Sequence, residues 1–484
     1  MSEWMSAEEA ADRLGVKPAT LYAYVSRGTL TRRKHEGRSV FNRAEIEDLA
    51  HRGRPRRQAG STELVIESAI TMLGEDRHYY RGREAIALAA TWRLEETALW
   101  LWTGAEPAAA GSWDAAPGAL AAAKQAGPGA LAAAQQAGPG ALAAAQEVRR
   151  GLSGDWDAAP DALAAAQQAG PGALAAAQEV RRGLSGDWEA APDALAAAQE
   201  AQRGLSGDVL PLDRLQVIVT ALAAADPVRH NLDPAAVAQT GKGLMAGMVD
   251  ALPGHGSDQA SRQTSRQNSR KGRDRGLHTR LWHKLGAVRA EEGLADVLRF
   301  ALVLLADHEL AASTLAARVA ASVRADPYAV VTTGLGTVSG ALHGGASLGV
   351  ESLLAEIAEP ERAAQAMGER LRRGERVAGF GHAVYRAGDA RGDALMDRIR
   401  AAVPGYPRLA VAEAVLEEAR RRALPAMNID FPLGVLTHLA GMPRGAGEAI
   451  FGVARTAGWL AHAMEEYANP TRLRLRAAYT GPLA

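Results

Sequence analysis

An internal tandem repeat in residues 108–208 is the feature that most restricts how this chain can fold. The pentapeptide Ala-Leu-Ala-Ala-Ala begins at positions 119, 130, 141, 162, 173 and 194, so its spacing is 11 or 21 residues. A period of 11 is close to helical, but Gly-Pro pairs break the stretch into helices of about two turns. Each repeat carries one leucine, which leaves such helices little apolar surface to bury. We therefore expect a solvent-facing insertion without catalytic function.

The insertion also contains larger repeated units, each of which begins with a tryptophan. Trp113, Trp156 and Trp188 head larger units of 43 and 32 residues, which differ by one 11-residue repeat. Removing the 75 residues between Trp113 and Trp188 leaves a single helix and loop before Leu210. A chain shortened in this register is therefore expected to fold.

Length and composition set the broad class of the chain. With 484 residues and 47% hydrophobic content, it is long enough for two or three domains and a large core. It has no cysteine, which excludes a disulfide framework, a thiolate nucleophile and a thiolate metal site. Charges from Glu8 onward interrupt the first apolar stretch, and no uncharged apolar run reaches 18 residues. We expect no signal peptide, no membrane span and a cytoplasmic location.

Residues 1–57 are interpreted as a separate domain. Ser6-Ala7-Glu8-Glu9 is a capping box for a first helix that Gly15 ends. A second helix is expected over residues 18–27. Two short helices around a tight turn are the helix-turn-helix arrangement.

A basic wing should follow these helices. Residues 29–41 are expected to form two strands that turn near Gly37, with a further helix over 43–51, and the whole resembles the excisionase and MerR-type winged helix. Residues 27–57 hold ten Lys and Arg against four Asp and Glu, a charge balance typical of phosphate binding. DNA binding is one interpretation, and a docking or regulatory module with a solvated basic face is the other. The DNA contacts would come from Arg27, Arg32, Arg33, Lys34 and Arg38.

The segment Gly379-Phe380-Gly381-His382, followed by Arg386 and Arg391, has the residue types of a ligand site. Glycines let the backbone approach a ligand closely. A histidine can donate or accept a proton near neutral pH. Arginines bind carboxylate or phosphate in a fixed geometry.

Three other residues stand in settings that favour function. His308 follows the apolar run 302–305 and is expected on a largely buried helix, while His343 stands among glycines. Asp430 lies between apolar residues, where desolvation should raise its pKa towards that of a useful base. Each residue alone is more often structural, but their occurrence together within residues 308–430 indicates a catalytic site.

These motifs, taken in their order along the chain, resemble those of the citrate synthase family. The resemblance runs through the segments 306–309, 343–345, 379–391, 428–430 and 452–459, and reaches back to 79–82 and 99–104. It covers residues 60–107 and 205–484. It implies a mainly α fold with large and small helical domains, the small one over 343–444, and a homodimer.

The resemblance also implies a reaction. The family condenses the methyl carbon of an acyl-CoA with the keto group of oxaloacetate and then hydrolyses the thioester. Asp430 matches the base, His343 matches the donor to the enol oxygen, and His382 matches the donor to the oxaloacetate carbonyl. No metal or prosthetic group is implied, because the coenzyme A thioester is a substrate.

Other matched positions would bind the two substrates. His308 matches a further oxaloacetate ligand, and Arg391 and Arg455 match the partners of its two carboxylates. A third arginine, Arg474, would come from the neighbouring subunit, although Arg472 and Arg476 leave this register open. The coenzyme A contacts would be Val377, Ala378, Gly379, Phe380, Gly381 and Arg386.

Some positions depart from the family pattern, among them Ala311, Ala390, Pro432 and Leu475. None of them removes a proposed catalytic group. Two alternatives to citrate formation stay open: 2-methylcitrate synthesis from propionyl-CoA, and a DNA-binding regulator whose body senses the same metabolites. Residues 254–276 are interpreted as a surface loop rather than a polyanion-binding segment.

Overall fold

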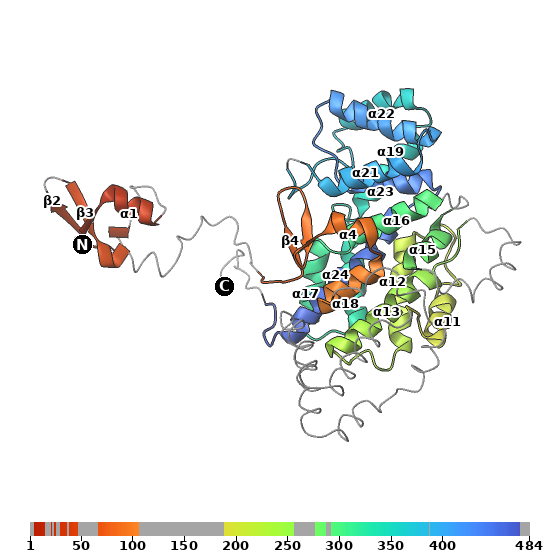
Figure 1. The fold of residues 1–484 in the computed structure, drawn as a ribbon, viewed down its shortest axis with the longest axis horizontal. Coiled ribbons are helices and arrows are strands. Elements are labelled where there is room, and N and C mark those ends of the chain that lie inside the picture. The colour runs from red at the N-terminus through yellow and green to blue at the C-terminus, as the bar shows by residue number, and fades with distance from the viewer. Residues whose placement is uncertain are drawn as a thin grey trace, which may run out of the picture. The chain divides into compact units, whose positions relative to one another are not determined.

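The computed structural model describes residues 4–14, 21, 24–25, 30–35, 38–46, 66–105, 188–255, 276–286, 292–386 and 388–474. The chain forms two compact units, residues 1–67 and 68–484, which are considered separately (Figure 1). Most of the repeat insertion, most of the second N-terminal helix including Arg27, and nearly all of the 254–276 loop lie outside the described residues.

The N-terminal unit has a sheet and a small core of its own. Helix α1 (Ala7–Leu14) begins at the expected capping box, in which the Ser6 amide donates to Glu9 and the Glu9 amide donates to Ser6 Oγ. Strands β2 (Arg32–His35) and β3 (Arg38–Asn42) form the expected wing hairpin. The buried core side chains are Met5, Ala10, Ala11, Leu14, Leu21, Leu30, Phe41 and Ile46.

The expectation of a two-stranded wing was incomplete. A third strand, β1 (Trp4–Ser6), pairs antiparallel with β3 and gives the order β1-β3-β2. Met5 lies opposite Phe41 in this pairing, and both side chains are buried. Three residues are too few to show strand alternation, so only the pairing reveals the strand.

The larger unit is mainly helical, as expected. A small antiparallel sheet of β4 (Thr71–Leu73), β5 (His78–Tyr80) and β6 (Arg83–Glu84) precedes the helices. The helices are α4 (Ala85–Thr91), α5 (Leu94–Thr103), α11 (Pro192–Ala201), α12 (Pro211–Ala225), α13 (Pro234–Ala251), α15 (Leu277–Leu285), α16 (Glu292–Leu305), α17 (Ala312–Ser322), α18 (Pro327–Val338), α19 (Gly345–Glu356), the 3₁₀ turn η2 (Pro360–Arg362), α20 (Ala363–Arg372), α21 (Ala390–Ala402), α22 (Pro407–Arg421), α23 (Asp430–Leu439) and α24 (Ala446–Ala468).

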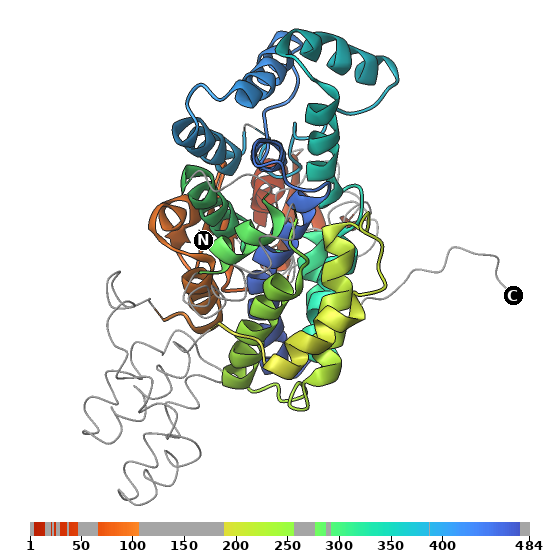
Figure 2. The same ribbon diagram turned by 90° about the vertical axis from the view of Figure 1, so that its right-hand side faces the viewer.

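Helix α24 is the centre of the body. Nearly all its side chains are buried, which is the pattern of a helix surrounded by protein. It packs on α5, α12, α13, α16, α17 and α18, and Figures 1 and 2 show it passing through the middle of the unit. A Cβ at Gly458 would lie 2.1 Å from Asp307 Oδ1, so only glycine lets α24 approach the segment after α16.

Helices α19 to α23 form one end of the body in both views (Figures 1 and 2). They correspond to the region 343–444 that the family resemblance assigns to a small domain. Proline at the first turn starts α22, and the Asp389 side chain caps α21 by accepting from the Arg391 amide. Among the described residues, no helix is both long and apolar enough to cross a membrane.

The last repeat belongs to the core, which corrects the interpretation of 108–208 as a solvent-facing insertion. Helix α11 packs on α12 and α13 and buries Ala194 and Ala198. The Trp188 ring stacks on Trp102 at 5.7 Å between centroids. The alanine face of α11 is suitable for a close helix–helix contact, so Trp188 and α11 are not part of a solvent-facing insertion.

Candidate active site

The Gly379–His382 segment is joined to the strand-like segment before Asp430. The Gly381 amide donates to the Ala426 carbonyl at 2.8 Å, and the Asn428 amide donates to the Gly379 carbonyl at 2.9 Å. Gly379 has φ +85°, and a Cβ there would lie 2.8 Å from Phe431 Cβ. This pairing brings His382 and Asp430, which are distant in sequence, into one region.

His382 is held as one neutral tautomer. Its Nδ1 accepts from the backbone amides of Val384 and Tyr385, each at 3.1 Å. These two contacts are shorter than the 3.5 Å between Arg391 Nη2 and His382 Nε2, so they favour Nδ1 as the acceptor and place the imidazole proton on Nε2. Burial lowers the pKa of His382, and the charge of Arg391 lowers it further. The half-buried ring can then donate from Nε2 to a carbonyl oxygen.

Arg391 is buried and paired with Asp389. The guanidinium Nε and Nη2 each donate to a different Asp389 oxygen at 2.8 Å. The second Asp389 oxygen also accepts from the Ile429 amide at 3.1 Å. Nη1 is left unused by this pairing and is the group through which Arg391 could bind an anion.

His308 lies beyond the end of α16, which corrects its expected place on that helix. Tyr80 Oη contacts the carbonyls of Val303, Leu304 and Asp307, and Glu309 has φ +52°, so the chain leaves the helix before His308. The His308 ring is buried. Its Nε2 lies 2.9 Å from Tyr385 Oη, and its centroid lies 5.5 Å from that of His382. Burial lowers the pKa of His308 well below its ordinary value, so the ring is neutral.

Arg455 reaches the same region from α24. It is buried, its Nε donates to the Leu305 carbonyl at 2.8 Å, and its guanidinium lies 4.5 Å from the Phe451 ring centroid. Its Nη1 has no hydrogen-bond partner among the described residues. A buried donor without a partner is costly, and an anionic ligand would remove that cost.

His343 is placed by Ser313 and Phe451. Its Nε2 lies 2.8 Å from Ser313 Oγ, and its ring packs edge-on against Phe451 at 5.5 Å. Ser313 Oγ accepts from Trp459 Nε1 at 3.3 Å, and its hydroxyl hydrogen is available to His343 Nε2; when it is donated there, the imidazole proton lies on Nδ1. Burial lowers the pKa of His343 to about 4. This neutral imidazole can donate from Nδ1.

Asp430 begins α23, where it is largely enclosed. Burial raises the pKa of its carboxyl to about 7, although the charges of Arg391 and Arg455 act in the opposite direction. The sequence argument expected this shift for the same reason. A carboxylate with this pKa is suited to accept a proton near neutral pH.

The predicted coenzyme A residues differ in their exposure to solvent. Val377 and Gly379 are buried, Ala378 and Phe380 are half-buried, and Arg386 is exposed. Arg474 is exposed and lies in an irregular segment after α24. Within the described part of this chain, Arg474 makes no hydrogen bond or ion pair with the other site residues, so its role stays a prediction for a neighbouring subunit.

A buried network of polar side chains surrounds Asp307, the residue next to His308. Asp307 accepts from Thr71 Oγ1 at 2.6 Å and pairs with His462 Nε2 at 3.2 Å. His462 Nδ1 accepts from Arg318, which also pairs with Glu466. Because Nδ1 accepts from Arg318, His462 donates to Asp307 through Nε2. The motif argument did not assign Asp307 or Tyr385 a role, although both lie inside segments that it singled out.

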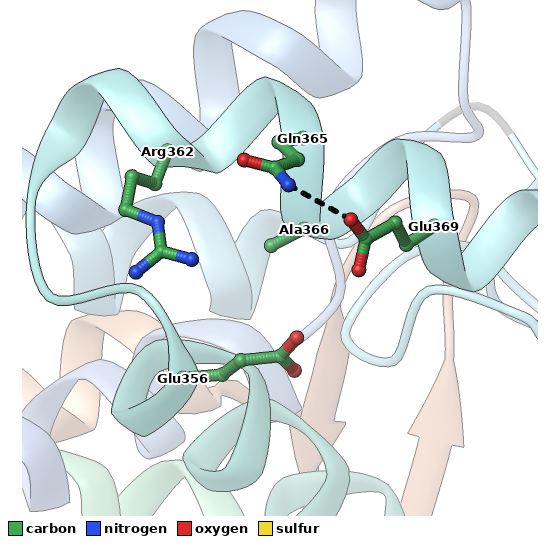
Figure 3. A pocket seen from close by; sticks show the side chains of 5 residues that line it. All are labelled: Glu356, Arg362, Gln365, Ala366 and Glu369. Atoms are coloured by element: carbon green, nitrogen blue, oxygen red, sulfur yellow. Dashed lines mark hydrogen bonds between the residues drawn. The ribbon is translucent and has the colours of Figure 1, made fainter.

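A small polar recess lies elsewhere, between α19 and α20 (Figure 3). In it Gln365 donates to Glu369 at 2.9 Å, and none of the predicted site residues lines it. In the part of the chain that the structure describes, no group of three or more His, Asp or Glu is arranged to hold a metal ion.

Solved structures with the same fold identify the class of protein to which this fold belongs. The chain is similar to citrate synthase from Thermotoga maritima MSB8, with a TM-score of 0.58 and 21% identity over 87% of this chain and 95% of that one. A ternary complex of citrate synthase from Thermoplasma acidophilum with carboxymethyl coenzyme A and oxaloacetate gives a TM-score of 0.56 and 18% identity, with the same coverage. The fold is that of the citrate synthases.

The sequence comparisons identify the family. Residues 61–476 match the model described as citrate synthase, C-terminal domain, and residues 4–54 match a helix-turn-helix domain. The chain belongs to the citrate synthase family. It is 39% identical over 186 residues to citrate synthase 2 of Bacillus subtilis (strain 168), covering 38% of this chain and 50% of that protein. It is 37% identical over 183 residues to 2-methylcitrate synthase 1 of Corynebacterium glutamicum, covering 37% and 48%. The chain thus spans about half the length of these curated relatives.

Proposed function

We propose that this protein condenses acetyl-CoA with oxaloacetate and water to give citrate and free coenzyme A. The observation that carries the proposal is the combination of a carboxyl group with a pKa of about 7, three neutral imidazoles and two buried arginines in one region. Such a set provides a base, donors for developing oxyanions, and cationic partners for a dicarboxylate.

Each group has a chemical role in this proposal. Asp430 takes a proton from the methyl carbon of the thioester, and His343 donates to the enol oxygen from Nδ1. The enol carbon attacks the keto carbon of oxaloacetate, while His382 donates to the keto oxygen from Nε2. Arg391, Arg455 and His308 hold the substrate, and water then cleaves the thioester. No metal or cofactor is required for these steps.

The choice of acyl group is the finer part of the proposal. Relatives named citrate synthase and relatives named 2-methylcitrate synthase match this chain at similar identity. One methylene in an apolar pocket is worth only about 1–3 kcal/mol. We take acetyl-CoA as the substrate and propionyl-CoA as the competing candidate.

The test is release of free coenzyme A by the purified full chain. Acetyl-CoA and propionyl-CoA would be compared at equal concentration, each with and without oxaloacetate, and the products identified by mass. Oxaloacetate-dependent release with citrate as the main product is expected. Faster release from propionyl-CoA would make the protein a 2-methylcitrate synthase, and absence of release from either would contradict an enzymatic function.

We further propose that the active form is a homodimer formed through α17. Leu315, Val319 and Val323 follow one another at helical spacing and are 36%, 46% and 61% exposed. A second copy on this apolar stripe would cover it, and a partner's Arg474 could complete the substrate site. Sedimentation of the wild type as a dimer, and of Val319→Lys as a monomer with reduced activity, is expected. A monomeric wild type with full activity would contradict the proposal.

Binding of DNA by the N-terminal unit is also proposed. It is supported by the helix-turn-helix match over residues 4–54 and by the exposed wing residues Arg32, Arg33 and Lys34. We also propose that the protein is cytoplasmic, a location in which its N-terminal unit could reach DNA.

A further inference from the structure

His78 is a buried histidine to which the motif argument assigned no role. It is the first residue of β5, is 0% exposed, and neither of its ring nitrogens has a hydrogen-bond partner among the described residues. Burying an unpaired polar group costs free energy, and buried polar groups without partners are rare enough to need an explanation. Because neither nitrogen is used, what this side chain supplies at its position is its ring.

The neighbours of His78 connect it to the substrate site. Its ring meets the His308 ring edge-on, with 5.5 Å between centroids and 63° between planes. His308 in turn lies 5.5 Å from His382, so the three imidazoles form a row. Two residues along β5, Tyr80 packs on His78 at 4.8 Å and contacts the carbonyls at the end of α16. His78 and Tyr80 therefore support the turn that carries His308.

The electrostatic setting agrees with this placement. Burial lowers the pKa of His78 well below its ordinary value, and the charges of Arg391 and Arg455 lower it further. The ring is therefore neutral and adds no charge to the site. An edge-to-face contact between neutral rings has a preferred geometry and so restricts how the His308 ring can turn.

We propose that His78 is a positioning residue of the oxaloacetate site, which holds the His308 ring in the orientation where Nε2 meets Tyr385. The inference rests on the proposed function, since it assumes that His308 binds oxaloacetate. It assigns His78 no contact with the substrate. Its role is to keep His308 from rotating away from the bound dicarboxylate.

Two ring-less variants of the full chain test the proposal, His78→Leu and His78→Gln, and either one is sufficient if the other fails to fold. Each should raise the KM for oxaloacetate by roughly 2- to 10-fold, the range that an edge-to-face ring contact is worth. The KM for the acyl-CoA should not change. His78→Leu should also have an unchanged or higher Tm, because it removes two unpaired polar atoms.

His78→Phe restores a ring at this position, and Tyr79→Leu is the matched control, because residue 79 points to the opposite face of β5. Both should keep the KM for oxaloacetate within about twofold of wild type, since neither removes the ring contact. Ring-less variants with a wild-type KM for oxaloacetate would overturn the inference and leave His78 as a core residue. A wild type that neither binds oxaloacetate in calorimetry nor releases coenzyme A would overturn the proposed function instead.

Discussion

The hydroxyl of Tyr385 lies 2.9 Å from Nε2 of His308, and both side chains are buried. The same tyrosine ring stacks on His382 at 4.8 Å and lies under the Arg391 guanidinium at 5.3 Å. His308 follows α16, whereas the other three residues come from the loop before α21 and from α21 itself. Tyr385 thus joins the two parts of the body that together form the site.

Asp430→Asn should reduce the rate of coenzyme A release by a factor on the order of 10² or more, because a positioned base is lost. Binding of oxaloacetate should persist, since the arginines and histidines are unchanged. Steady-state kinetics and calorimetry measure the two effects. Asp393→Asn, at a neighbouring carboxyl on α21 whose pKa burial also raises, is the control and should stay active. Wild-type turnover in Asp430→Asn would remove Asp430 from the mechanism.

The pH dependence should report the same carboxyl. Because the pKa of Asp430 is about 7, kcat/KM should fall about tenfold per pH unit once the pH is well below that value. The folded-state pKa is raised, so the stability that Asp430 contributes is present at acidic pH and is lost as the pH rises through about 7. The gain in Tm of Asp430→Asn over wild type should therefore be larger at pH 8 than at pH 5. An equal difference at both pH values would contradict the assignment.

Arg391→Ala and Arg455→Ala should raise the KM for oxaloacetate far more than that for the acyl-CoA. Each loses a charge-assisted hydrogen bond worth about 1.5–3 kcal/mol. Only Arg391→Ala leaves a buried carboxylate, Asp389, unpaired, which costs about 3–5 kcal/mol and should lower the Tm. Arg398→Ala, which breaks an exposed ion pair between α21 and Asp296 of α16, is the control and should change neither quantity. Equal effects on both substrates would show that the arginines do not bind oxaloacetate.

Deletion of residues 114–188 should leave folding and turnover close to those of the parent. The cut places Trp113 directly before Glu189, so Trp113 can take the position from which Trp188 stacks on Trp102. Long surface segments cost little closure free energy. A deletion that also removes α11, over 114–202, should instead lower solubility and Tm, because α11 packs on α12 and α13. Collapse of the shorter deletion would show that further repeats pack on the core.

Duplex DNA binding should weaken steeply with salt, with a log–log slope of about −0.9 per phosphate contacted. Replacing the wing residues Arg32, Arg33, Lys34 and Arg38 by alanine should flatten the slope without affecting coenzyme A release. The charge-matched control replaces four exposed arginines of the larger unit, Arg372, Arg408, Arg420 and Arg421. Mobility shifts over a salt series give the slopes. Failure to bind a library of random duplexes at low salt would favour a docking role for this unit.

Features governed by neighbouring residues were predictable from the sequence. The capping box of Ser6 and Glu9 forms because its two hydrogen bonds span only three residues. The partial burial of Asp430 among its apolar neighbours was predicted, together with the direction of its pKa, for the same local reason. The order of the motifs also identified the family, which the family match confirms.

Other features depended on contacts between segments far apart in the chain. Trp188 packs against the core because its ring stacks on that of Trp102, which belongs to α5. His308 leaves α16 because Tyr80, more than two hundred residues earlier, contacts the last carbonyls of the helix. No local pattern marks His78, whose importance comes from its contact with His308. The sequence by itself determined the chemistry of the side chains and those helices and turns that local patterns specify. The tertiary structure decided which of them meet, because burial, tautomer and pKa are set by neighbours that only folding brings together.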